Sequence, residues 1–314
     1  MTSRASTTAT TASHDGARAD QQRHIHLSAR DIAILRDLAD QRLLTAELVA
    51  WRHFPPADGT PAWHPARSRV SPAAQRRLLQ LYHAGYVDRL EQPVWPNTGG
   101  APIAYRLSGF GAATLAAVDG RAAYVPAWAS ALSMDHTLFA ARVWCALAVA
   151  CTTTDNLEMC EWIGESEARR RDAARKQPAP APDKRPIPDG TGTLVLDGRD
   201  RVRVFVEVDQ GTETHAIVAQ KLTTYARYRG SPDYRDTYGD DSWRILLVTV
   251  GSGRLETLVA TVKGLERTLP ALHGRVLCGL RASITPGAIL EPLWIVPHSG
   301  RRRALVREGL RMRT

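Results

Sequence analysis

Between residues 27 and 118, a series of helix-start and turn signals constrains the fold more than any other feature of the chain. Ser28 is a helix-capping residue with an acid three residues later, the spacing of a capping box. Ser71-Pro72 places another cap residue before a proline at the first helical position. With a further helix expected at about 45–53, the pattern predicts three helices in succession.

The segment after the third helix is typical of a β-hairpin. Gly85 suits the end of that helix, and strand-like runs follow at 86–95 and 103–107 around the turn-forming Pro-Asn-Thr-Gly-Gly. Ser108 then caps a closing helix that extends to about residue 118. Together these elements predict a compact domain with the order of a winged helix-turn-helix.

The third helix, residues 71–84, has the two faces that a DNA-reading helix needs. Leu78 and Leu81 fall on its apolar side, and long polar side chains fall on the opposite side. The apolar side would hold the helix on its scaffold while the donors face the groove and phosphates of duplex DNA. The residues expected to contact DNA, in or before this helix and along the hairpin, are Arg67, Arg69, Arg76, Arg77, Gln80, His83, Arg89 and Arg106. The alternative is a domain that docks another protein through this surface.

The composition indicates a soluble protein with a polyanionic partner. A net charge of +9 favours nucleic acid, because neutralised phosphates release counterions, although a solvated Arg-rich surface is the alternative. The four cysteines have neither CxxC pairing nor histidines at metal spacing, so we expect neither a zinc site nor a disulfide framework. The N-terminal stretch lacks the apolar core of a signal peptide, and the apolar run 138–151 is too short to span a bilayer. We therefore expect a cytoplasmic protein without a membrane partner.

Acidic residues cluster around two expected strands and the helix that follows them. Asp189 precedes one strand, and Glu207 and Asp209 stand at the end of the next, on one face because side chains alternate in a strand. Carboxylates that converge at sheet ends suit Mg²⁺, which can activate water for phosphodiester cleavage. On the next helix, Glu213 and Lys221 share a face, from which the ammonium can stabilise phosphate charge. All five are candidate catalytic residues, and the first three are the candidate ligands of Mg²⁺, the one cofactor that the sequence suggests.

This layout resembles the PD-(D/E)xK nuclease superfamily over roughly residues 136–250. The resemblance implies a core of a helix, three antiparallel strands, a helix and a further strand. It also implies that Asp189 is the first motif aspartate and Glu207 the second acid. The superfamily pattern has a lysine two residues after the second acid, where this chain has Asp209, so Lys221 would have to supply the ammonium from the helix. Glu165 is a candidate additional acid.

The whole chain resembles the plasmid replication-relaxation family, which pairs a winged helix with a nuclease-like domain. The resemblance spans about residues 27–250. Its pattern is carried by Pro188, Asp189, Glu207, Asp209, Gly211, Thr212, Glu213, Lys221 and Tyr225. It implies a role in the replication or mobilisation of plasmids or other mobile elements, with duplex DNA as a partner and a relaxase or replication initiator as a further candidate.

These resemblances and the composition together predict an α+β or α/β protein. We expect a winged helix-turn-helix at 25–125 and a restriction-endonuclease-like α/β domain at 130–298. The remaining segments are a disordered tail at 1–24, a basic loop rich in Pro and Arg at 166–187, and a basic tail at 299–314.

Three functions are compatible with these patterns. The first, which the missing lysine favours, is a DNA-binding protein of replication or mobilisation whose nuclease-like domain is degenerate. The second is a Mg²⁺-dependent endonuclease or nickase directed by the winged helix. The third is a transcription regulator. Its second domain would sense a ligand or mediate assembly. The alternative to a catalytic role for the acids is a satisfied polar network at a sheet edge, with residues 209–212 only a turn and helix cap. A homodimer is compatible with each of the three.

Overall fold

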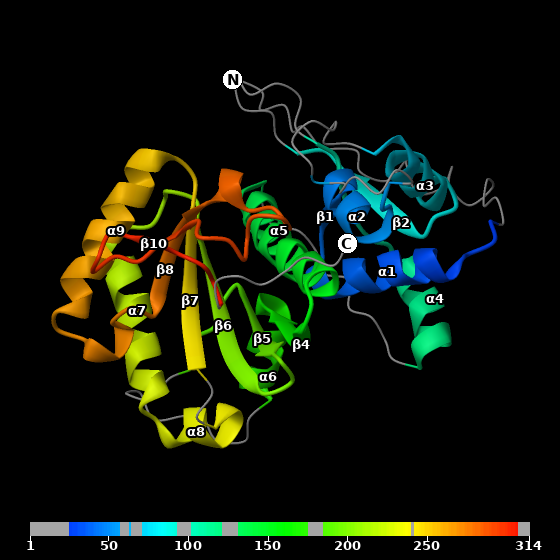
Figure 1. The fold of residues 1–314 in the computed structure, drawn as a ribbon. Helices are drawn as coiled ribbons and strands as arrows, with labels where there is room; N and C mark the ends of the chain where they lie inside the picture. Colours follow the sequence, from blue (N-terminus) through cyan, green and yellow to red (C-terminus); the bar gives the residue numbers. More distant parts are fainter. Residues whose placement is uncertain are drawn as a thin grey trace, which may run out of the picture. The chain divides into compact units, whose positions relative to one another are not determined.

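The structure, a computed structural model, describes residues 25–56, 63, 71–92, 102–120, 131–174, 185–239 and 242–306. The chain divides into two compact units (Figure 1). Unit 1 comprises residues 1–46 with 70–127, and unit 2 comprises residues 47–69 with 128–314. Residues 47–69, expected in the N-terminal domain, thus group with the second unit.

Unit 1 combines helices with a small antiparallel sheet in the strand order β1-β3-β2. Its core includes Ile34, Leu38, Leu78 and Leu81, none of which has measurable exposure. The elements are α1 (Ala29–Gln41), β1 (Leu44–Thr45), α3 (Pro72–His83), β2 (Val87–Leu90), β3 (Ala104–Leu107) and α4 (Gly109–Asp119).

The helices of unit 1 begin where the capping signals predict. Ser28 and Asp31 form a reciprocal capping box, in which the Asp31 carboxylate accepts a 2.7 Å bond from the Ser28 backbone N–H. Ser71 and Ser108 accept bonds from backbone N–H groups three residues later at the starts of α3 and α4. Gly85, which follows α3, adopts a φ of +83°, a conformation that glycine tolerates best.

Unit 2 is built around a mixed sheet of seven strands. Helix α2 (Ala46–His53) belongs to this unit except for Ala46, its first residue. The other elements are α5 (Ala131–Thr153), β4 (Leu157–Gly164), α6 (Glu165–Ala173), β5 (Gly190–Leu196), β6 (Asp200–Asp209), α7 (His215–Arg229), α8 (Pro232–Tyr238), β7 (Ser242–Thr249), α9 (Ser252–Glu266), η3 (Pro270–Leu272), β8 (Val276–Leu280), η4 (Arg281–Ser283), β9 (Trp294–Ile295) and β10 (Arg302–Arg303).

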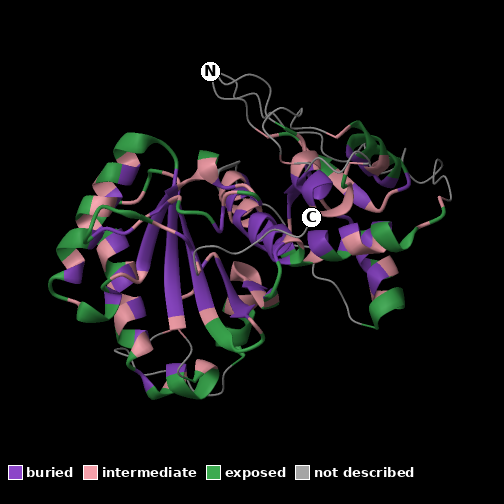
Figure 2. Cartoon of the chain, in the orientation of Figure 1, coloured by how far each residue is buried: buried purple, intermediate pink, exposed green. Residues whose placement is uncertain are grey.

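The strand order of the sheet is β10-β9-β8-β7-β6-β5-β4. Strands β4, β5 and β6 form an antiparallel meander, and β7 and β8 run parallel to β6. Helices α7 and α9 cover one face, where they pack with Phe205, Leu247 and Val276, and α5 packs against the opposite face (Figure 1). The central strands are therefore buried along most of their length (Figure 2). The mixed helix and sheet content confirms the α+β fold class.

The expected basic loop at 166–187 is wrong for its first part, because residues 165–173 form α6. Arg169 pairs with Glu165, and Arg171 pairs with Glu167, both at i,i+4 spacing. Such pairs stabilise an exposed helix, and alanine and arginine are good helix formers. The basic C-terminal segment also begins in ordered structure, since Arg302 and Arg303 form β10 against β9.

Helix α2 packs within unit 2 against α5. The Arg142 guanidinium of α5 binds the Glu47 carboxylate at 3.0 Å and lies over the Trp51 ring.

Among the described residues, one helical stretch, Ser133–Thr153, is long and apolar enough to cross a membrane, and most of it is buried in the protein. The core helix of a soluble protein has the same property.

Candidate active site at one end of the central sheet

The antiparallel pairing of β5 and β6 brings Asp189 and Glu207 together. Asp189 precedes β5, and its backbone N–H donates to Val206 O at 3.0 Å. Its Oδ2 accepts a 2.7 Å bond from the backbone N–H of Val208, which fixes the carboxylate beside the last residues of β6. The two acids that the sequence separates by eighteen positions are therefore neighbours across two strands.

Glu207 is buried, with 6% of its side chain exposed. Its Oε1 accepts a 2.5 Å bond from the Tyr225 hydroxyl, and Lys221 Nζ lies 3.3 Å from its Oε2. Burial and the adjacent Asp189 carboxylate raise the pKa of Glu207 to about 7, against the opposing effect of Lys221. A carboxyl group with such a pKa, set among specific charged partners, is typical of functional sites.

Lys221 reaches the carboxylates from α7. The helix is capped by Thr214, not by Thr212, so Glu213 stands just before it. Lys221 Nζ nevertheless lies 2.6 Å from Glu213 Oε1, and the lysine side chain is 36% exposed. Burial opposes the charge of this ammonium, but the carboxylates of Glu207 and Glu213 raise its pKa above the usual range. The site therefore holds a permanent positive charge with access to solvent.

Asp209, the third acid expected to bind metal, is placed differently. Arg254 of α9 binds both of its carboxylate oxygens at 2.8 Å, and Oδ2 also accepts a 2.7 Å bond from the Thr249 hydroxyl. Burial opposes ionisation, but these bonds lower the pKa of Asp209. The bidentate pair, together with the bond from Arg254 to Glu213 O, gives this carboxylate a structural role in joining β6 to α9. This bidentate pair argues against the expected role of Asp209 as a metal ligand.

His136 is a site residue that the sequence did not indicate. It lies on α5, and its Nε2 is 2.9 Å from Asp189 Oδ1, a contact that raises the pKa of the imidazole. Donor atoms of His136, Glu165 and Asp189 all lie within 4.8 Å of one another. Glu165, expected as an additional acid, is thus close to the site, although it also pairs with Arg169. No local pattern marks His136, because its partner is more than fifty positions away.

A small cavity adjoins this group of side chains. Its lining combines the charged residues of the site with apolar residues of β6, α7 and β7. The lining residues are Glu207, Val208, Asp209, Glu213, Val218, Lys221, Leu222 and Leu247.

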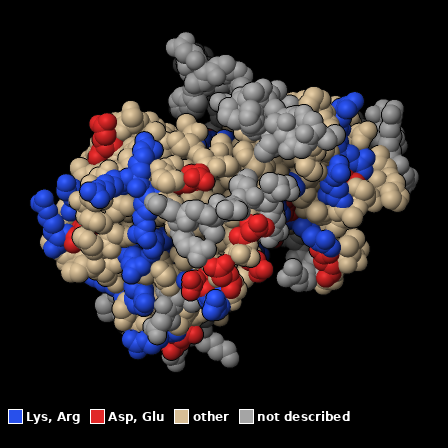
Figure 3. Space-filling model, viewed as in Figure 1, with Lys and Arg blue, Asp and Glu red and all other residues tan. Residues whose placement is uncertain are grey.

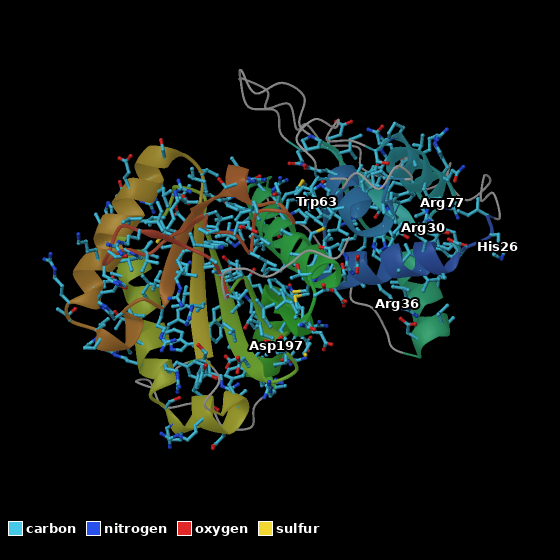
Figure 4. The ribbon with its side chains drawn as sticks, in the orientation of Figure 1. His26, Arg30, Arg36, Trp63, Arg77 and Asp197 are labelled. Atoms are coloured by element: carbon cyan, nitrogen blue, oxygen red, sulfur yellow. The ribbon has the colours of Figure 1, made fainter. Side chains whose placement is uncertain are left out.

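The candidate DNA-binding residues of α3 fall into two groups. Arg76, Gln80 and His83 are exposed. Arg77 instead binds Asp31 through two bonds of 2.6 and 2.7 Å, and it also donates to the backbone oxygen of His26 (Figure 4). Because the Asp31 side chain is only 1% exposed, Arg77 serves first to neutralise it.

The remaining candidates in unit 1 lie in the hairpin or before α3. Arg89 is exposed on β2 with its guanidinium over the Tyr82 ring, and Arg106 of β3 pairs with Asp88 at 3.1 Å. Arg67 and Arg69, together with the tip of the hairpin, lie outside the described residues.

Comparison with known protein families identifies the chain. The family model described as replication-relaxation matches residues 35–240, about two-thirds of the sequence. The chain belongs to the replication-relaxation family. The resemblance to this family that the sequence indicated is thereby confirmed, and membership supports a role in replication or mobilisation. No curated protein and no solved structure matches the chain.

The family match covers most of the candidate active site of this replication-relaxation protein. His136, Asp189, Glu207 and Lys221 all lie within it. Arg254, which engages Asp209, lies beyond its end, as do β7, α9 and the strands that follow.

Proposed function

We propose that this replication-relaxation protein binds duplex DNA through unit 1 and cleaves a phosphodiester bond at a divalent-metal site on Asp189 and Glu207 of unit 2. The observation that carries the proposal is the position of the Lys221 ammonium, 3.3 Å from Glu207. This position supports the interpretation that Lys221, on α7, takes the role of the lysine that the PD-(D/E)xK pattern has on the strand. This favours an active site over the degenerate one that the missing lysine suggested.

The carboxylates of Asp189 and Glu207 fit a hard divalent cation. Asp189 and Glu207 approach each other closely enough that Asp189 raises the pKa of Glu207, and burial strengthens the effect. A cation bound between them would offset this repulsion, and oxygen donors are those that Mg²⁺ and Mn²⁺ accept. When bound, such an ion lowers the pKa of water and stabilises the leaving oxygen of a phosphodiester.

The neighbouring side chains hold this arrangement in place. The Tyr225 hydroxyl orients Glu207, and Glu213 holds the Lys221 ammonium beside it. His136 contacts Oδ1 of Asp189, while the Val208 N–H binds the other carboxylate oxygen, Oδ2, so that both oxygens are held in place. The Lys221 side chain is partly exposed, so its ammonium can contact a phosphate oxygen and stabilise the charge that develops during cleavage.

The topology of unit 2 also supports the proposal. In chain order, α5, the antiparallel strands β4, β5 and β6, helix α7 and the parallel strand β7 follow the order that the PD-(D/E)xK resemblance implies. The two acids stand at corresponding places, one before β5 and one near the end of β6. The departure is confined to Asp209, where Arg254 occupies the carboxylate.

DNA binding rests on unit 1 and on charge. Its order of α1, β1, α3, β2 and β3, with β1 paired to β3, supports the winged-helix interpretation. Exposed Arg76, Gln80 and His83 lie on α3, the helix proposed to read the major groove. Lys and Arg side chains also form a band across the face of unit 2 drawn in Figure 3, which suits the DNA backbone.

A plasmid-nicking assay tests the catalytic part of the proposal. The full chain with Mg²⁺ or Mn²⁺ should convert supercoiled plasmid to the open circle, and Glu207→Gln should abolish this conversion. Glu256→Gln is the matched control, since Glu256 is an exposed residue of α9 outside the site. Cleavage that survives Glu207→Gln would overturn the assignment of the site.

A non-cleaving, DNA-holding protein is the second candidate. The observation in its favour is that both oxygens of Asp189 already accept bonds, from His136 and from the Val208 N–H. This candidate predicts salt-dependent duplex binding with no nicks under either metal. It shares the first proposal's DNA contacts, so only the nicking result separates the two.

A further inference from the structure

A second group of potential metal ligands lies in unit 2, beyond the segment that matches the family. Glu266 is the last residue of α9, His273 follows η3, and His298 lies in the turn between β9 and β10. Donor atoms of these three residues all lie within 4.8 Å of one another. None of them belongs to the candidate active site.

Glu266 is the central member of this group. Its side chain is only 2% exposed, although it is ionisable. Oε1 accepts a 2.9 Å bond from the Gly274 N–H and lies 3.7 Å from His298 Nδ1. Oε2 is buried and accepts no hydrogen bond from the described residues. Burying a carboxylate oxygen without a hydrogen-bond partner costs free energy, and a bound metal cation would offset that cost.

The two histidines stand beside this carboxylate on the solvent side. Their rings stack with centroids 4.0 Å apart, and both residues are exposed, with 35% exposure for the His298 side chain. Exposed imidazoles can rotate with little loss of packing. Bonds of about 2.0–2.1 Å in a tetrahedral site require donor separations of about 3.3 Å, so closing the site needs shifts of about 1 Å.

We propose that Glu266, His273 and His298 bind a borderline transition-metal ion of the Zn²⁺ class. Two imidazoles and one carboxylate form a known zinc donor set, and imidazole selects such ions over Mg²⁺. The fourth position faces solvent, because both histidines are exposed. The sequence alone argued against a zinc site, since the search for it rested on cysteines and on ligands close in the chain.

The position of the group indicates what the ion does. It joins the end of α9 to the segment entering β8 and to the β9–β10 turn. Strands β9 and β10 contain two residues each, so little backbone pairing holds this edge of the sheet. A metal bridge would stabilise it by linkage, because an ion that binds only the folded state raises the free energy of unfolding.

The test uses the full chain, freed of metal by chelation, and is independent of the proposed nuclease function. Calorimetric titration of the wild type with ZnCl₂ should show one bound equivalent of Zn²⁺. The double variant His273→Ala/His298→Ala should bind this equivalent at least tenfold more weakly. Zn²⁺ should raise the Tm of the wild type more than that of the variant. Co²⁺ in place of Zn²⁺ should give the visible absorption of a low-symmetry site in the wild type only.

Two controls separate this site from other causes. His215→Ala removes an exposed histidine at the start of α7 and should retain the equivalent. Glu207→Gln disables the candidate active site and should also retain it, so failure of the nuclease proposal leaves this one standing. Glu266→Gln keeps the shape of the side chain and should lose the equivalent. Equal Zn²⁺ affinity and equal Tm shift in the wild type and the double-histidine variant would overturn the proposal.

Discussion

Glu207 and Asp209 stand two residues apart on the same face of β6, both buried, yet the structure treats them in opposite ways. Asp209 accepts two bonds from one arginine and another from Thr249, so its pKa is lowered. Glu207 has a tyrosine hydroxyl and a partly exposed lysine, with a second carboxylate nearby, so its pKa rises to about 7. The partners that α7 and α9 supply, not the residue type, decide which acid has a lowered pKa and which a raised one.

The same contrast separates two neighbouring arginines of α3. Arg77 neutralises the buried carboxylate of Asp31. Arg76 is exposed and makes no hydrogen bond or ion pair within the described part of the chain. Adjacent residues of one type therefore have different surroundings, and substitutions can test whether Arg77 serves stability and Arg76 serves the proposed DNA binding.

The largest effect is expected from Asp209→Asn. The substitution leaves the Arg254 guanidinium without its carboxylate, and breaking such a buried pair costs about 3–5 kcal/mol. Glu207→Gln should cost less than about 1 kcal/mol, because glutamine resembles the protonated carboxyl, which a pKa of about 7 keeps substantially populated near neutral pH. Urea unfolding of both variants measures the difference. Equal losses would remove the distinction between the two acids.

Lys221→Met should affect catalysis more than stability. Removing a charge that stabilises the transition state costs about 2.7–4 kcal/mol, or about a 10²–10³-fold loss in nicking rate. The free energy of unfolding should change little, since the lysine is partly exposed. Lys263→Met on α9 is the matched control. A nicking rate within a few-fold of wild type would show that the ammonium has no catalytic role.

The arginine pair of α3 gives effects of intermediate size. Arg77→Ala should lower the free energy of unfolding by about 1–3 kcal/mol, because it leaves the Asp31 carboxylate buried without its partner. Arg76→Ala should leave stability unchanged, weaken duplex binding and reduce the salt slope by about one. Urea unfolding and fluorescence anisotropy at several salt concentrations measure the two. Lost stability in Arg76→Ala, together with weakened duplex binding and unchanged stability in Arg77→Ala, would contradict the roles assigned to the two arginines.

The smallest effect is a difference in pH dependence. The pKa of Glu207 is higher in the folded protein, about 7, than its ordinary value of 4.5. The folded state therefore binds the extra proton, and this contribution to stability is complete below about pH 4.5 and lost as pH rises through about 7. Asp209, with a lowered pKa, contributes stability that is lost as pH falls through its folded value.

The Glu207→Gln variant isolates the first of these contributions. His136, whose pKa Asp189 raises, loses its own contribution in an overlapping pH range. The free energy of unfolding should be measured for the wild type and the variant at intervals between pH 4 and 8. The difference between the two removes the His136 contribution that they share. A difference that does not vary with pH would show that Glu207 titrates normally.

Much of the fold could be predicted from short stretches of sequence. The capping signals at Ser28, Ser71 and Ser108 located three helix starts, because a cap bonds to a backbone group only three residues away. Alternation along β6 also placed Glu207 and Asp209 on one face. The expected basic loop at 166–187 was wrong over α6, because ion pairs at i,i+4 spacing support a helix in this arginine-rich segment.

Sequence patterns were thus sufficient to locate most of the helices and strands, α6 excepted, and to place Asp189 and Glu207 at strand ends. The partners of these acids depend on tertiary packing. Arg254 reaches Asp209 across 45 positions, and His136 reaches Asp189 across 53. The grouping of Glu266 with His273 and His298 likewise depends on where β9 pairs with β8. Local hydrogen bonds set the elements, whereas the charge and pKa of each side chain depend on neighbours that strand order and helix packing bring together.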